Sequence, residues 1–204
     1  MFPLLAAIPY AWSYCEEKNS GYQRNIVVRS GKTQYFLSKY IAIFLSGGLT
    51  MVIPLAFNFL LTAMVFPAVT PNVIYDTAYG IFGSSLMSAL YYSNPFLYLL
   101  FYLLIDFVFA GLVACIGFMV SFFVKYYVAT IIVPLFLMLG VHYFRQFVYT
   151  SYAIQYKEIS PLYFLRPVQS AYRASWLIIL AEIAALLLMT VVPLLLWERK
   201  REIY

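Results

Sequence analysis

Long apolar runs separated by short polar segments dominate the chain. The clearest runs cover 40–66, 95–124, 126–147 and 176–197. A membrane-crossing helix needs about 20 mostly apolar residues, so each run predicts one span. The opening stretch, 1–14, is also apolar but falls below the lower limit of about 17 residues for a full crossing, so it predicts a partial span. The pattern therefore predicts an all-α, polytopic transmembrane helix bundle with four full spans and a partial N-terminal one.

Composition agrees with this pattern. Apolar residues make up 64% of the chain and charged residues only 10%, whereas soluble domains carry about 25% charged residues. Too few charges remain to build a water-soluble surface. We therefore expect residues 1–204 to form a single transmembrane domain with short connections.

Positive charge in the connecting segments predicts the orientation. Segment 67–94 contains no Lys or Arg, whereas segment 15–39 contains Lys18, Arg24, Arg29, Lys32 and Lys39. Because short cytoplasmic loops are enriched in Lys and Arg, 15–39 is predicted to be cytoplasmic and 67–94 external. Alternation then places the C-terminus in the cytoplasm of a multi-pass cell-membrane protein. Segment 148–174 would lie outside despite its basic residues, and its apolar pieces are expected to fold back into the interface.

Three polar residues inside the runs are the intramembrane candidates. Asp106 lies near the middle of 95–124, where an unpaired charge costs at least about 2.5 kcal/mol. It must therefore face protein or water, either as a pathway carboxylate or as a neutral group hydrogen-bonded between helices. Glu182 is expected to pair with His142, Arg145 or Arg173.

No catalytic or metal-binding pattern occurs in the sequence. His142 is the only histidine, and no His or Cys pair has the spacing of metal ligands. Serine nucleophile motifs are absent as well. We therefore expect no catalytic residue and no metal site on this chain.

Small residues recur four apart within 95–124. Ala110 with Ala114, and Gly111 with Cys115, predict a stripe along which a second helix can approach closely. Cys115 and Cys15 are both expected to be buried, free thiols.

Segment 15–39 carries the most specific pattern. Glu16 and Glu17 open it and basic residues follow. The spacing predicts one short helix after 19–20 that presents 26–28 on its apolar side and ends near Gly31. A second helix is expected to begin at Thr33 and lead into the 40–66 span. Taken alone, the first piece could be a passive anchor on lipid headgroups.

The order of residues in 15–39 resembles the first cytoplasmic loop of membrane permease subunits of type-2, export-type ABC transporters. The resemblance rests on acids at 16–17, Gly-Tyr at 21–22, an apolar run at 26–28, Arg-Ser-Gly at 29–31, Tyr35 and Ser-Lys at 38–39. It implies that this segment is the coupling helix that docks on a separate ATPase subunit. The coupling residues would be Glu16, Glu17, Gly21, Tyr22, Arg24 and Arg29. Segment 160–167 is similar to the family's short re-entrant helices on the outer side.

The resemblance also implies partners. Two permease chains, identical or different, would pair in the lipid bilayer with ATPase subunits that hold ATP and magnesium, and this chain would need no cofactor and no nucleic acid. Members of the family have six spans, so one and a half helices are expected ahead of Met1.

The function expected from the sequence is therefore a permease subunit that forms the pathway of an ATP-driven exporter. Two alternatives stay open. One is a self-contained carrier, or a substrate-binding membrane subunit, that uses Asp106 as its coupling carboxylate. The other is a membrane-embedded enzyme built on Asp106, Glu182 and His142. The residues do not specify a substrate.

Overall fold

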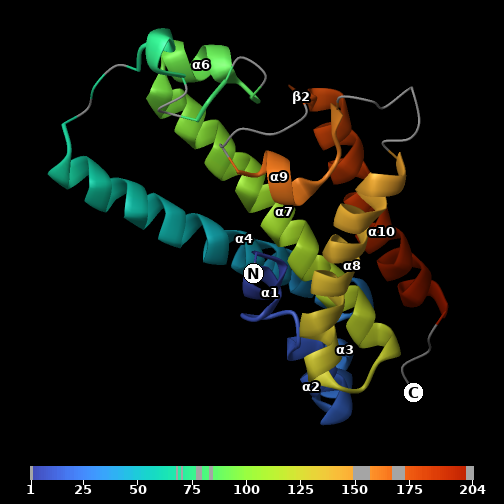
Figure 1. Cartoon of the computed structure of the whole chain (residues 1–204). Coiled ribbons are helices and arrows are strands. Elements are labelled where there is room, and N and C mark those ends of the chain that lie inside the picture. Colours follow the sequence, from blue (N-terminus) through green and yellow to red (C-terminus); the bar gives the residue numbers. More distant parts are fainter. Residues whose placement is uncertain are drawn as a thin grey trace. The chain divides into compact units, whose positions relative to one another are not determined.

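The computed structural model describes residues 2–67, 69, 71–76, 80–82, 85–148, 157–166 and 173–200. In this part the chain is helical apart from a parallel pair of two-residue strands, β1 (Lys157–Glu158) and β2 (Arg173–Ala174). Figure 1 shows the order of the helices along the chain.

Four helices dominate: α4 (Lys32–Val65), α7 (Pro95–Phe123), α8 (Tyr127–Val148) and α10 (Trp176–Lys200). All four are long and apolar enough to cross a membrane, and they cover the four runs identified in the sequence to within one residue (Figure 1). The prediction of a helical chain with four long apolar helices is confirmed. These helices support a transmembrane, multi-pass protein, since a helix satisfies its own backbone hydrogen bonds in lipid.

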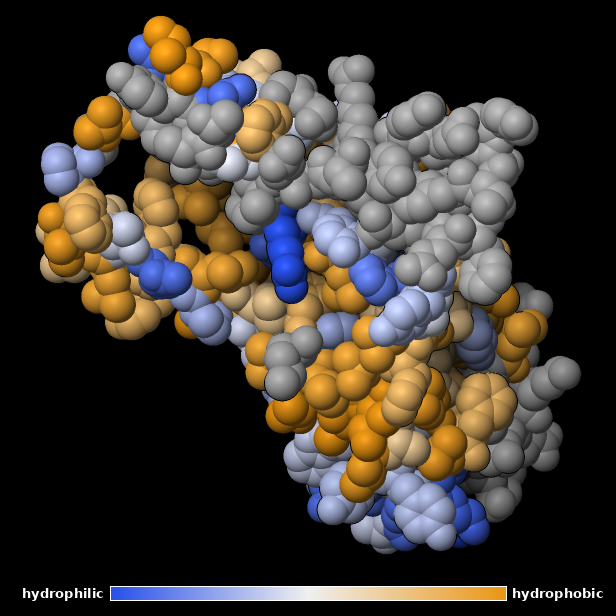
Figure 2. Space-filling model, viewed as in Figure 1, coloured by the Kyte–Doolittle hydropathy of each residue, from blue (hydrophilic) through white to orange (hydrophobic). Residues whose placement is uncertain are grey.

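The outward-facing side chains of these helices are large and apolar. Leu60 of α4 is 58% exposed, and Leu177 and Leu188 of α10 are 75% and 64% exposed. Figure 2 shows this hydrophobic surface over the helices, with one group of hydrophilic residues around segment 13–30. Soluble monomers rarely expose contiguous apolar surface on this scale, so lipid is the natural solvent for these faces.

The N-terminal segment differs from the single partial helix expected over 1–14. It forms α1 (Phe2–Ala7) and α2 (Ser13–Asn19), with a turn between them. Pro9 lies in this turn; proline has no backbone N–H, and its ring clashes with the carbonyl four residues earlier, which interrupts a helix. The remaining short helices are α3 (Tyr22–Ser30), η1 (Val73–Tyr75), α6 (Ser88–Ser93) and α9 (Pro161–Phe164).

Contacts divide the chain into two compact units. The first comprises Met1–Met51, Phe107–Leu137 and Ile183–Tyr204, and the second comprises Val52–Asp106 and Met138–Glu182. In the first unit every residue of α7 from 109 to 119 is buried. A helix that is apolar and buried all round is a central helix, so this half of α7 forms the core of the unit.

Helix α4 crosses α7 at close range within the first unit. A Cβ on Gly48 would lie 2.6 Å from the ring of Phe107, and a Cβ on Gly111 would lie 2.6 Å from the ring of Phe44. The two rings meet edge to face with centroids 5.6 Å apart. Each glycine therefore provides the space that the opposite phenylalanine fills.

The stripe of small residues predicted on α7 is confirmed at this crossing. A Cβ on Gly47 would lie 2.5 Å from Cβ of Ala114 and 3.1 Å from the carbonyl oxygen of Ala110. The partner positions on α4, Gly47 and Gly48, were not predicted from the sequence.

The second unit has its own aromatic packing. Tyr98 lies between Tyr91 and Tyr102, with ring centroids 5.2 and 4.8 Å away. The hydroxyl of Tyr92 donates to the carbonyl of Ile81 at 2.7 Å, which ties the preceding loop to α6.

Candidate docking surface on α3

Two glycines delimit the short helix α3. Gly21 has φ 74° and Gly31 has φ 78°, a region that favours glycine because a Cβ is strained there. Gly31 also closes the helix, as its N–H donates to the carbonyl of Val27 at 2.9 Å. The predicted short helix ending near Gly31 is confirmed, and α4 follows directly at Lys32.

One face of α3 packs against the bundle. Gln23 is buried, and Ile26 and Val27 pack against the hydrophobic core of the first unit. Positions 23, 26 and 27 share one helical face by the i, i+3, i+4 rule. The prediction that Val28 also lies on the apolar side is wrong, because Val28 is 86% exposed. Val28 is the third apolar residue in a row, and successive helical residues point about 100° apart, so it falls outside the narrow face that Ile26 and Val27 share.

The opposite face of α3 is exposed and basic. Tyr22, Arg24, Val28 and Arg29 all point away from the core. Beside them a hollow of about 390 Å³ is lined by Tyr22, Asn25, Ile26, Val28, Arg29 and Ser30. Tyrosine and arginine are enriched at protein interfaces, so this combination of cations, an aromatic ring and an aliphatic side chain suits a protein partner.

Glu17 braces α2 against α4. Its Oε1 lies 2.6 Å from Nζ of Lys39, and its Oε2 accepts a hydrogen bond from the hydroxyl of Tyr35. Lys39 is only 6% exposed, and its ammonium also lies 4.7 Å from the centre of the Tyr10 ring. The carboxylate of Glu17 is thus engaged inside the chain, whereas Glu16 beside it is exposed.

The end of α2 caps the end of α7. Nζ of Lys18 donates to the carbonyls of Ser121 and Phe122 at 3.3 and 2.9 Å, and Nδ2 of Asn19 donates to the carbonyl of Lys125 at 2.7 Å. The last carbonyls of a helix have no partner within it and carry partial negative charge, so a cation there is favourable. This contact fixes α2 to α7.

Aromatic packing completes the attachment. The ring of Tyr14 lies 5.8 Å from Phe36 of α4 and 5.3 and 5.0 Å from Phe118 and Phe122 of α7. All four belong to the core of the first unit. From the sequence, Lys39 was noted only as a basic residue of the loop and Tyr14 was not singled out, since each stands at the edge of an apolar run and resembles an ordinary interfacial residue.

The intramembrane candidates occupy separate places. Asp106 is buried in α7, at 9% exposure, which agrees with the expectation that it faces protein. The carboxylate oxygens of Glu182 are buried in α10. Nδ1 of His142 lies 2.9 Å from Oγ of Ser160, and its ring stacks on Tyr163 at 5.3 Å.

These three residues do not come together as a metal site in the described part of the chain. Within the described residues, no group of three or more His, Cys, Asp or Glu side chains is close enough to hold a metal ion. The side chains of Arg145 and Arg173, predicted as partners of Glu182, lie outside the described part of the chain. That pairing stays a prediction.

Comparison with known proteins yields one match. A family model with the description protein of unknown function, DUF2705, matches residues 1–203. No curated protein and no solved structure matches the chain.

Proposed function

The chain belongs to the DUF2705 family of proteins of unknown function, and we propose that it is the membrane-spanning permease subunit of an ATP-driven exporter of the type-2 ABC class. In this role α3 docks on a separate ATPase subunit, which binds ATP and magnesium. The long apolar helices, with those of a second permease chain, line the translocation pathway. The observation that carries the proposal is a short helix with an exposed basic face, α3, which packs on the core of the first unit and leads directly into α4.

Coupling requires that a movement of the docked helix α3 is transmitted to the membrane-spanning helices. The brace from Glu17 to Lys39 joins α2 to α4, and Lys18 joins α2 to the end of α7. From Gly31 the chain continues without a linker into α4. A displacement of α3 would therefore move α4 and α7 instead of being absorbed by a loose loop.

The residues of the predicted coupling set fall into two roles in this proposal. Tyr22, Arg24 and Arg29 would contact the partner, whereas Glu16, Glu17 and Gly21 belong to the segment that positions α3. The partner surface should be acidic, to complement the two arginines. In the cell membrane, α3 and the C-terminus would both face the cytoplasm.

The first test is co-purification of the intact chain from its native membrane in mild detergent. We expect a soluble ATPase subunit in stoichiometric amount. A chain that comes down alone, or only with another membrane protein, contradicts the proposal.

The second test reverses charge on α3. We expect R24E and R29E each to weaken ATPase retention about tenfold, since a lost charge-assisted contact is worth about 1.5 kcal/mol and the new charge repels the acidic partner. R166E is the matched control, because Arg166 is also exposed but lies beyond α9. Equal retention by all three variants, with each still monodisperse in detergent, excludes α3 as the docking helix.

A second candidate function is a self-contained carrier that uses the buried carboxylate of Asp106. Asp106→Asn separates the two. A carrier loses proton-coupled transport with this change, whereas the permease keeps its ATPase partner.

A further inference from the structure

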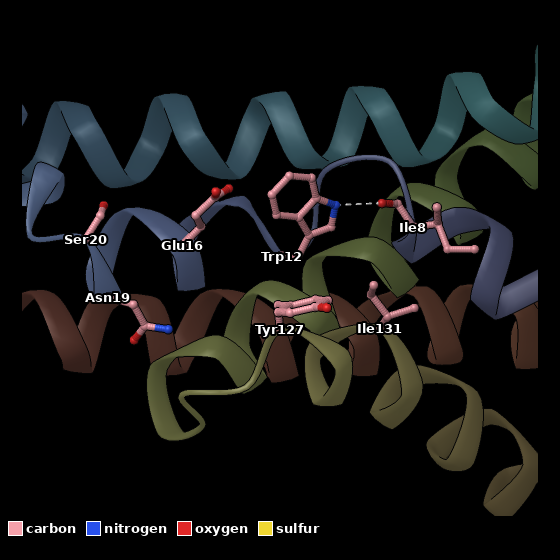
Figure 3. Close-up of a pocket in the computed structure, with 7 residues that line it drawn as sticks. All are labelled: Ile8, Trp12, Glu16, Asn19, Ser20, Tyr127 and Ile131. Atoms are coloured by element: carbon pink, nitrogen blue, oxygen red, sulfur yellow. Dashed lines mark hydrogen bonds between the residues drawn. The ribbon is translucent and has the colours of Figure 1, made fainter.

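A cavity of about 640 Å³ opens between the N-terminal segment and the start of α8, within the first unit (Figure 3). It is lined by Ile8, Trp12, Glu16, Asn19, Ser20, Tyr127 and Ile131. Small-molecule sites in proteins typically measure about 300–1,000 Å³. The cavity thus has the size of a site for an organic molecule and is separate from the exposed face of α3.

The apolar wall of this cavity is preformed. Nε1 of Trp12 donates to the carbonyl of Ile8 at 2.9 Å (Figure 3). This bond satisfies the only polar atom of the indole and holds the ring in place. Tyr127 and Ile131 come from the first turns of α8 (Figure 3), so two aromatic and two aliphatic side chains supply most of the lining.

Among the described residues that line the cavity, Glu16 is the only charged one. Lys39 pairs with the neighbouring Glu17 and not with Glu16. The side chain of Glu16 is exposed, so its carboxylate is accessible to a ligand cation.

Two other polar side chains of the cavity, those of Asn19 and Ser20, already act as donors within the chain. Nδ2 of Asn19 donates to the carbonyl of Lys125 at 2.7 Å, and Oγ of Ser20 donates to the carbonyl of Glu17 at 3.3 Å. A phosphate headgroup would therefore meet a carboxylate and no basic lining residue. The charge pattern disfavours anionic and zwitterionic lipids and favours a simple cation.

From this arrangement we propose that the cavity binds a hydrophobic organic cation with one positive charge. The cation lies against Glu16 and within reach of the aromatic rings, which attract positive charge. Its apolar body fills the space between Ile8 and Ile131. This inference concerns binding by the chain itself and does not depend on an ATPase partner.

The test is a titration of the full chain, purified in nonionic detergent, with the fluorescent cation rhodamine 6G, followed by anisotropy. We expect saturable binding that weakens at least about fivefold in E16Q, because the ion pair is lost, and that weakens with added salt. D76N is the matched control; it also removes one carboxylate, but in the second unit. I131W keeps the charge while filling the cavity, and should likewise weaken binding.

Sulforhodamine B, an anionic dye with a similar ring system, should not bind saturably. Two results overturn the proposal. One is equal affinity of wild type, E16Q and D76N for rhodamine 6G, which would mean partition into the detergent micelle only. The other is unchanged affinity in folded I131W, which would place the dye elsewhere.

Discussion

Glu16 and Glu17 are chemically identical neighbours with opposite environments. Glu17 is paired with a nearly buried lysine and a tyrosine hydroxyl, whereas Glu16 is exposed at the edge of a cavity. Successive residues of a helix point about 100° apart, which is enough to turn one toward α4 and the other away from it. The same substitution at the two positions should therefore have different effects, because only Glu17 makes a structural ion pair.

The brace gives a prediction at the residue scale. E17Q leaves the buried ammonium of Lys39 without its counterion, and we expect the free energy of unfolding to fall by about 2 kcal/mol. This is less than the roughly 3–5 kcal/mol for a fully buried pair, because Glu17 is partly exposed. Thermal unfolding in detergent measures it. E16Q makes the same chemical change at an exposed site and should not alter the melting temperature.

The double variant E17Q/K39M should recover part of the loss, because no unpaired charge remains. Equal melting temperatures for E17Q and wild type would show that the pair contributes nothing.

At the scale of elements, the crossing of α4 and α7 depends on glycine. A side chain at Gly48 or Gly111 would meet not only a ring but also backbone, with the carbonyl oxygens of Phe107 and Phe44 at 2.9 and 2.8 Å. Rings can rotate away, but backbone oxygens cannot. The helices would have to separate.

We therefore expect G48V and G111V each to destabilise the protein by about 1–3 kcal/mol or more. Thermal unfolding and the monodisperse fraction on size-exclusion chromatography measure the effect. G140V is the control, because a Cβ at Gly140 meets nothing within 4 Å and the change carries the same β-branched cost in a helix. If G48V and G140V behave alike, the close crossing is not required.

At the scale of the whole molecule, the open question that experiment can settle is orientation. Both native cysteines, Cys15 and Cys115, are free and buried, as expected. Burial raises the pKa of the Cys15 thiol, so little reactive thiolate forms at neutral pH. The native chain should thus give little background labelling when single cysteines are introduced elsewhere.

Two exposed positions are predicted from the sequence to lie on opposite sides of the membrane. Val28 of α3 is 86% exposed, and Ile74 in the loop after α4 is 79% exposed. With a membrane-impermeant maleimide on intact cells, we expect I74C to be labelled at once and V28C only after permeabilisation. The reverse pattern would place α3 outside and remove it from contact with a cytoplasmic ATPase.

The sequence by itself determined the four long helices, the break at Gly31 and the stripe of small residues on α7. Each of these depends on residues close together in the chain: the length of an apolar run, a positive φ, or a four-residue repeat. Only the tertiary structure decided that Glu17 pairs while Glu16 stays open, that Val28 faces away from the core, and that a cavity forms beside α2. These outcomes depend on distant partners, such as Lys39, 22 residues beyond Glu17, and Lys125, 106 residues beyond Asn19. Local pattern carries no information on which of two neighbouring side chains such a partner will meet, because that is set by how the helices pack.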